Sequence, residues 1–249
     1  MRIRYAKHTD DLQTLWQVCF EDDGNVFFEH DFDPGRAIVM ADDADVPAAM
    51  LHWMPQTLYL PGPDGTDGRE VDAAYLLGIA TRPERQGQGY AGALVQRIVS
   101  ELDRMGMPAA FLLPCGQRMA RFYQRHGFRP MGLCPAPVEV APPDEAALKE
   151  ITQNVAATLD ALYERMYAPC AHPRRGWERW KRIAADYELR WSGGRYRVYD
   201  GDTLMEDSDA RFSVTDKRPA LAGVRVLRAG ALPEDMPFAA NLLYNERVD

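Results

Sequence analysis

The pattern of hydrophobic and polar residues predicts a chain of alternating strands and helices. Residues 75–81 form an apolar run bounded by turn residues, as expected of a buried strand. A glycine-bearing turn follows at residues 86–91, after which apolar residues recur at helical spacing from Leu94 to Met105. Gly106 then stands where a C-terminal helix cap is expected. The order of strand, tight turn and helix is therefore the clearest prediction in the sequence.

Other segments show weaker forms of the same two patterns. Apolar runs between turn residues predict strands, and amphipathic segments predict helices. The predicted strands are residues 2–6, 37–40, 48–60, 210–214 and 223–227, with a hairpin around Gly193 and Gly194 within residues 188–199. The predicted helices begin after the capping residues Thr9, Asp10 and Asp11, run from Gly116 through Tyr123, and cover residues 155–167.

The turn at residues 86–91 is a candidate anion site. The first N–H groups of a helix have no intrahelical partner, and the helix dipole favours negative charge there. Glycine lets a phosphate approach the backbone closely. A Walker A loop is excluded, because Gly89 is followed by Tyr90 and not by Lys and Ser or Thr.

Two other phosphate-binding patterns fit the turn to different degrees. Gly87, Gly89 and Gly92 spell GxGxxG, but a dinucleotide site also needs an acidic residue about 20 positions later. None occurs between Phe111 and Val138, which disfavours a nicotinamide or flavin cofactor. The third pattern, Gln/Arg-x-x-Gly-x-Gly/Ala, is matched in register with the helix by Gln86, Gly89 and Ala91.

With this third pattern the chain resembles the GNAT superfamily of acetyl-CoA-dependent N-acyltransferases. GIATRPERQGQGYAGAL looks like the fourth strand, pyrophosphate loop and third helix of that family. FLLPCGQRMARFYQRHGF looks like its fifth strand and fourth helix. The resemblance implies an α/β fold with a mixed, mostly antiparallel sheet and flanking helices. It also implies acetyl-CoA (coenzyme A) as the cofactor.

The resemblance assigns roles to particular residues. Tyr123 matches the tyrosine that often protonates the leaving thiolate, although it could also simply pack beside coenzyme A. A terminal carboxylate can act as the base in the Eis-like branch, which makes Asp249 a catalytic candidate. The expected cofactor-binding residues are Gly78, Ile79, Ala80 and Thr81 for pantetheine, and Gln86, Gly87, Gln88, Gly89, Tyr90 and Ala91 for the pyrophosphate.

The residues that handle the acceptor are less clear from the sequence. LQTLWQVCFEDDGNVFFEHDF looks like the helices that form a wall of the acceptor site in one GNAT branch. Its carboxylates at residues 21–23 could attract an ammonium group, or they could belong to a solvated loop. His52 and Asp72 fall near the central strand and could take a proton from the acceptor or be structural. No residue identifies itself as the general base.

The sequence of the second half of the chain indicates a separate domain. A proline-rich stretch near residue 135 suggests a boundary between a catalytic domain, residues 1–135, and a smaller domain, residues 136–249. LDALYERMYAPCAHPRRGWERW resembles the Eis-like tandem arrangement, which implies a degenerate GNAT-like α+β domain without a second coenzyme A site. The basic, aromatic residues 174–182 could bind nucleic acid but are more typical of an interdomain face.

Charge and composition favour some classes of binding partner over others. The net charge of −8 disfavours nucleic acid and is compatible with an amine substrate. No run is long and apolar enough for a membrane span, and the first residues have no apolar signal region, so we expect a cytoplasmic protein without a membrane partner. The four cysteines lie far apart without ligand spacing, so we expect no metal site. Formation of a homo-oligomer stays open.

These observations favour an N-acetyltransferase that moves acetyl from acetyl-CoA to a primary amine of a small molecule or peptide. Direct attack of the amine, with Tyr123 as general acid, is the expected mechanism. The alternative is a regulatory module that binds acyl-CoA without catalysing transfer.

Overall fold

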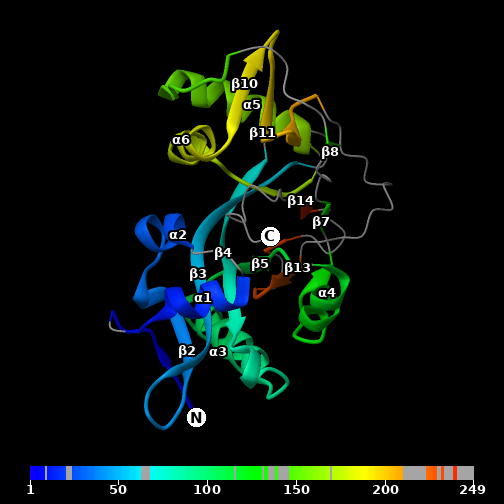
Figure 1. The fold of residues 1–249 in the computed structure, drawn as a ribbon. Helices are drawn as coiled ribbons and strands as arrows, with labels where there is room; N and C mark the ends of the chain where they lie inside the picture. The colour runs from blue at the N-terminus through cyan, green and yellow to red at the C-terminus, as the bar shows by residue number, and fades with distance from the viewer. Residues whose placement is uncertain are drawn as a thin grey trace.

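The structure is a computed structural model, and Figure 1 shows its fold. It describes residues 1–8, 10–20, 24–62, 68–114, 116–130, 132–133, 138–139, 146–168, 170–209, 223–228, 231–232 and 238–239. Within these residues the chain forms one large mixed sheet, a smaller antiparallel sheet, a two-stranded parallel pair and six α-helices. No helix in this part of the chain has the length and apolar character needed to cross a membrane.

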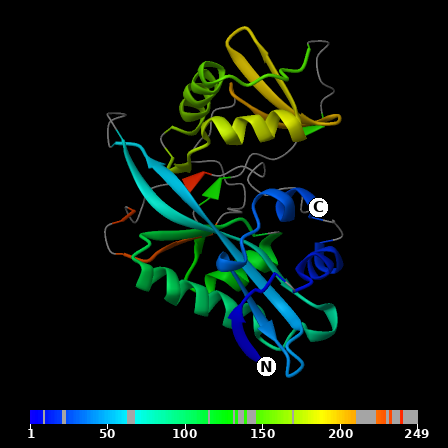
Figure 2. The same cartoon turned by 90° about the vertical axis from the view of Figure 1, so that its left-hand side faces the viewer.

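The large sheet is mostly antiparallel and has the order β1-β2-β3-β4-β5-β13-β6, with β9 paired to one end of β3. The long strands β3 and β4 form its centre (Figure 2). Its strands are β1 (Arg2–Tyr5), β2 (Ala37–Ala41), β3 (Pro47–Leu60), β4 (Arg69–Thr81), β5 (Ala109–Leu112), β6 (Arg129–Pro130), β9 (His172–Pro173) and β13 (Gly223–Val226).

Helices cover both faces of this sheet. Successive side chains of a strand point to opposite faces, and β2 is buried along its whole length because both faces are packed. Ile38 and Met40 join the core beneath α3, whereas Val39 and Ala41 join the core beneath α1 and α2. The helices are α1 (Leu12–Phe20), α2 (Asn25–His30), α3 (Tyr90–Met105) and α4 (Gly116–Gln124), with short 3-10 turns η1 (Pro34–Arg36) and η2 (Pro83–Arg85).

A second hydrophobic core lies among two helices and the smaller sheet, above the large sheet in Figure 1. The tight turn between β10 and β11 is made by Gly193 and Gly194, whose φ values of 60° and 76° suit a two-residue hairpin. The elements of this unit are α5 (Gln153–Tyr167), α6 (Gly176–Asp186), β8 (Val138–Glu139), β10 (Glu188–Ser192), β11 (Arg195–Asp200) and β12 (Thr203–Asp207).

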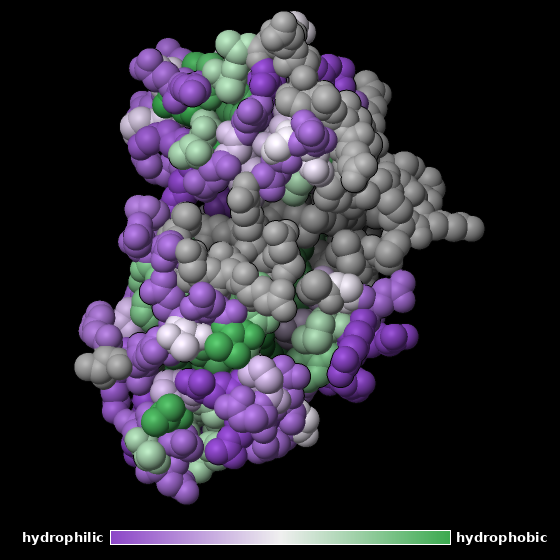
Figure 3. Space-filling view, in the orientation of Figure 1, coloured by the Kyte–Doolittle hydropathy of each residue, from purple (hydrophilic) through white to green (hydrophobic). Residues whose placement is uncertain are grey.

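The face of the molecule in Figure 3 is mainly polar where it is coloured. Large exposed apolar side chains occur singly, for example Val18, Met105 and Trp191. Scattered apolar residues are normal on a globular protein and do not mark an interface.

The structure confirms the GNAT-like α/β fold that the sequence predicts, and the predicted hairpin forms between residues 188 and 200. The predicted strand at residues 210–214 lies outside the described residues. The division into domains 1–135 and 136–249 stays a prediction. In the structure, β13 returns to the large sheet between β5 and β6, and β14 (Phe238–Ala239) pairs with β7 (Gly132–Leu133).

Candidate functional site

The central feature of the site is an opening between the parallel strands β4 and β5. Their pairing covers Ala73, Ala74 and Tyr75 of β4. From residue 76 to residue 81, β4 has no partner in β5 among the described residues. Backbone N–H and C=O groups along this edge of β4 can therefore pair with an extended ligand, as a sheet edge pairs with a peptide.

A β-bulge interrupts β4 within the same stretch. Met50 of β3 pairs with Ala80 and His52 pairs with Leu77, so Gly78 and Ile79 together face Leu51. Gly78 has φ 58°, and a Cβ there would lie 2.7 Å from Cζ3 of Trp16. Only glycine fits this backbone without strain. A bulge leaves one residue out of the ladder and commonly occurs beside active sites.

The glycine turn lies at the end of β4 and starts α3. Gly87 and Gly89 have φ values of 76° and 82°, and a Cβ at either would meet nothing within 4 Å. The first helical hydrogen bond runs from Ala93 N–H to Gly89 C=O, so the N–H groups before Ala93 have no helical acceptor. Residues 86–89 are exposed. This geometry leaves space and donors for a phosphate group.

Side chains of the turn hold one another in place. Tyr90 donates its hydroxyl to Gln88 Oε1 at 2.6 Å, and Gln86 Nε2 donates to the carbonyl of Thr81 at 3.3 Å. The second contact ties the turn to the end of β4. Arg85 is exposed directly before the turn and adds positive charge there, although it lies outside the Gln-x-x-Gly-x-Ala pattern.

Tyr123 lies on α4 and is 6% exposed. It shares a hydrophobic core with Leu94 and Val95 of α3, and Ile79 of β4 packs against the same core. Burial raises the pKa of the Tyr123 hydroxyl above its ordinary value of 10. The residue is therefore protonated at neutral pH, as a proton donor must be.

Contact between α3 and α4 depends on a glycine. A Cβ on Gly92 would lie 2.9 Å from Cε1 of His126, which follows α4. The ring of His126 also packs on Phe122 at a centroid distance of 4.8 Å. Gly92 therefore lets the end of α4, the helix that carries Tyr123, approach the first turn of α3.

The candidate bases from the sequence do not converge on this opening. His52 is 3% exposed, its Nε2 accepts the backbone N–H of Asp33, and its ring packs against Phe27 and Phe32. Burial lowers the pKa of His52 to about 4. Asp72 is exposed on β4 opposite Thr57. These contacts favour structural roles for both residues.

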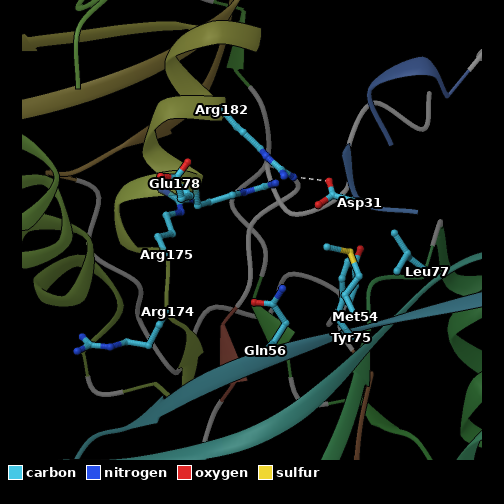
Figure 4. Close-up of a pocket in the computed structure, with 10 residues that line it drawn as sticks. Asp31, Met54, Gln56, Tyr75, Leu77, Arg174, Arg175, Glu178 and Arg182 are labelled. Carbon is cyan, nitrogen blue, oxygen red and sulfur yellow. Dashed lines mark hydrogen bonds and ion pairs between the residues drawn. The ribbon is translucent and has the colours of Figure 1, made fainter. Parts of the chain in front are cut away.

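A pocket of about 220 Å³ lies between the large sheet and α6. Figure 4 shows Met54 and Gln56 of β3 with Tyr75 of β4 on one side, and Arg175, Glu178 and Arg182 on the other. Leu77 also lines the pocket and directly precedes Gly78 of the bulge. The pocket therefore adjoins the stretch of β4 at which its pairing is interrupted.

The arginines of this pocket are the functional candidates that sequence reasoning missed. Residues 174–182 were predicted to form an interdomain face, which stays a prediction because the division into domains does; in the structure several of them lie beside the large sheet. Arg174 donates its backbone N–H to Thr57 C=O at 2.8 Å, and Arg182 forms an ion pair with Asp31. The helical spacing of Arg175, Arg179 and Arg182 was the available signal.

The remaining predicted site residues fall into two groups, those outside the described residues and those within them. Asp249 and the carboxylates at residues 21–23 lie outside the described residues. The backbone stretch from Gly78 to Thr81 and the turn from Gln86 to Ala91 are described, and the site formed by them remains a prediction.

Comparison with solved structures supports the fold assignment. A GCN5-related N-acetyltransferase from Anabaena variabilis is 14% identical, with a TM-score of 0.59 over 92% of this chain and 74% of the other. One from Kribbella flavida is 18% identical, with a TM-score of 0.57 over 92% and 72%. Eis1 from Mycobacterium abscessus is 18% identical, with a TM-score of 0.53 over 80% of this chain and 53% of Eis1. Comparison with curated proteins gave no match.

A family match, together with the fold, supports a coenzyme A-dependent acyltransferase. A family model described as an acetyltransferase (GNAT) domain matches residues 2–131, more than half of the chain. The chain belongs to the GNAT acetyltransferase family. GNAT domains use acetyl-CoA, and the unobstructed space over Gly87 and Gly89 fits a pyrophosphate at the start of α3.

Proposed function

We propose that this protein transfers an acetyl group from acetyl-CoA to a primary amine by direct attack of the amine. The opening between β4 and β5 is the observation that carries this proposal. Among the described residues β5 does not pair with β4 from residue 76 to residue 81, and the glycine turn follows at the end of this stretch. This arrangement suits a long cofactor arm whose phosphates lie at a helix N-terminus.

The proposed binding residues act mainly through their backbone. Gly78, Ile79, Ala80 and Thr81 would pair with the amide groups of the pantetheine arm. The loop from Gln86 to Ala91 would donate N–H groups to the pyrophosphate. The bound cofactor supplies an acetyl group activated as a thioester.

Tyr123 would hold a proton for the departing sulfur. Its buried environment keeps the hydroxyl neutral, because burial disfavours the phenolate. Transfer of the proton to sulfur would form the free thiol of coenzyme A and leave a phenolate on Tyr123, which must regain a proton from solvent before the next turnover. The core that Tyr123 shares with α3 and Ile79 supports its placement beside the cofactor.

The acceptor must lose a proton before it attacks. A lysine-like amine with a pKa near 10.4 is neutral only about once in 10³ molecules at pH 7. Neither His52 nor Asp72 lines the pocket. Asp31 and Glu178 do line it, and Asp31 forms an ion pair with Arg182, so we assign no protein side chain to this task and leave the proton to water.

The test compares Tyr123→Phe with the unchanged protein. Loss of the general acid should lower kcat by about 10²-fold or more with little change in coenzyme A binding. Tyr5→Phe is the matched control, because it removes a phenolic hydroxyl that contacts Glu101 on α3, in a contact that plays no part in the proposed mechanism. Turnover is measured as coenzyme A release with a panel of amines.

Two results would contradict the proposal. Unchanged kcat in Tyr123→Phe would remove this residue from the mechanism. Tight coenzyme A binding without an acetylated product for any amine would favour the non-catalytic binding module.

A further inference from the structure

The wall of the pocket on α6 carries a stripe of guanidinium groups. Arg179 and Arg182 lie three residues apart on one face of α6, Arg175 directly precedes the helix, and all three line the pocket. Like charges at this spacing destabilise a helix by a few tenths of a kcal/mol per pair. The stripe is therefore unfavourable for the helix alone and needs negative partners.

Carboxylates contact Arg175 and Arg182. Glu206 binds Arg175 through two contacts of 2.5 and 2.9 Å and is 2% exposed, so it neutralises this arginine from outside the pocket. Asp31, which follows α2, reaches Arg182 across the pocket (Figure 4). The Asp31 contact shows that a carboxylate fits against Arg182 at this wall.

The opposite wall is largely apolar and lies beside the proposed site of acyl transfer. Met54, Tyr75 and Leu77 line it, and Leu77 is the residue before the bulge at Gly78. A ligand that binds the arginines at one end therefore has its other end directed toward β4. At about 220 Å³ the pocket is smaller than the roughly 300–1,000 Å³ typical of drug-sized ligands, which favours a small molecule.

We propose that the acceptor is a small primary amine that also carries a carboxylate, as an amino acid does, and that Arg179 and Arg182 hold this carboxylate. A guanidinium suits the role because its planar N–H groups bind a carboxylate in two parallel contacts. Glu178 also lines the pocket, so the proposal depends on the geometry of the guanidinium groups and not on net positive charge alone. The inference rests on the proposed acetyl transfer.

The experiment uses matched acceptors with the full chain and acetyl-CoA. Amino acids with the amine remote from the carboxylate are compared with their carboxamides, because distance keeps the pKa of the two amines similar. An aminoalkyl phosphonate of the same length is the third acceptor, which tests whether another anion binds in place of the carboxylate. We expect kcat/KM for the carboxylate to exceed that of the carboxamide by at least about tenfold, as for one good charged contact.

Variants test the assigned arginines. Arg179→Gln and Arg182→Gln should each reduce the preference for carboxylate over carboxamide severalfold. Lys181→Gln is the control, because it removes a positive charge from the same helix at an exposed position that does not line the pocket. Arg179→Gln leaves the contact of Arg182 with Asp31 intact, so it remains informative if Arg182→Gln folds poorly.

A binding measurement separates this inference from the proposed function. Calorimetry with the coenzyme A complex compares the affinities for the carboxylate and the carboxamide without turnover. Carboxylate-dependent binding without acetyl transfer would support the carboxylate site at Arg179 and Arg182 but contradict the proposed function, and with it the role of the ligand as acceptor. Transfer to carboxamides at equal rate, a preference for the phosphonate, or an unchanged preference in both arginine variants would overturn the inference alone.

Discussion

At the scale of single residues, the glycine turn makes the most direct prediction. Gly89 has φ 82° and open space where a Cβ would stand. Gly89→Glu would place a negative charge at the start of α3, where the phosphate should bind. We expect affinity for coenzyme A to fall by at least about 10²-fold, or about 3 kcal/mol. Isothermal titration measures the change.

A second glycine supplies the control for this experiment. Gly201, in the turn between β11 and β12, has φ 54° and equally open space. Gly201→Glu introduces the same side chain with a similar backbone cost of about 1–2 kcal/mol. Equal loss of coenzyme A affinity in both variants would mean that backbone strain explains the effect, and the phosphate site would have to be moved.

Two buried histidines predict a loss of stability in acid. Burial lowers the pKa of both His52 and His172 from 6.5 to about 4. Above pH 6.5 the imidazoles are neutral in both states. Between pH 6.5 and about 4 the unfolded chain binds protons that the folded chain does not bind, so stability falls as the pH falls. Each histidine should account for up to about 3 kcal/mol.

Urea unfolding at several pH values between 7 and 4 measures this slope. Gln in place of His52 can still accept the N–H of Asp33, and His52→Gln should flatten the pH dependence. A slope that is unchanged in both His52→Gln and His172→Gln would show that other groups cause the acid sensitivity.

At the scale of elements, the packing of α4 on α3 makes a further prediction. Gly92→Ala would bring a Cβ to 2.9 Å from the ring of His126. The ring or the end of α4 must shift, and α4 carries Tyr123. We expect kcat to fall about tenfold or more, because misplacing a catalytic group by a fraction of an ångström is costly.

The double variant Gly92→Ala with His126→Ala tests the proposed cause. Removing the ring removes the clash, so much of the lost kcat should return. If the double variant is as slow as Gly92→Ala alone, the contact between Gly92 and His126 does not control the position of α4.

The elements that the sequence predicts best are those with local signals at both ends. Helix α3 begins after Gly89 and ends before Gly106, whose N–H contacts Asp103 C=O, as the capping pattern predicts. The start of β4 is missed, because Arg69, Glu70 and Asp72 interrupt the apolar run. These side chains are exposed, and the segment is a strand only because it pairs with residues 57–60 of β3. Long-range pairing leaves no local signal of this kind.

At the scale of the whole molecule, the glycine turn and the pocket at α6 also differ in whether a local sequence signal marks them. The phosphate turn is continuous in sequence, so its residues could be predicted together. The pocket joins Asp31, Met54 and Tyr75 to an arginine stripe more than 90 positions later. Only the tertiary fold brings these residues together, and sequence spacing reveals the stripe but not the surface that it faces.

The buried pair of Arg175 and Glu206 predicts how the second core depends on charge. Both side chains have no exposed area, and Glu206 also accepts from the hydroxyls of Tyr167 and Tyr196. Glu206→Gln would leave the guanidinium without a counterion, since burial opposes its charge and Glu206 offsets that cost. We expect the free energy of unfolding to fall by about 3–5 kcal/mol.

A double replacement distinguishes the charge effect from lost packing. Arg175→Met with Glu206→Gln removes the buried positive charge together with its partner. This variant should be more stable than Glu206→Gln alone, because a buried pair can often be replaced by apolar groups at little cost. Thermal unfolding and urea unfolding measure both variants. If the double variant is the less stable one, Arg175 contributes more through its contacts with the rings of Tyr163 and Trp180 than its unpaired charge costs.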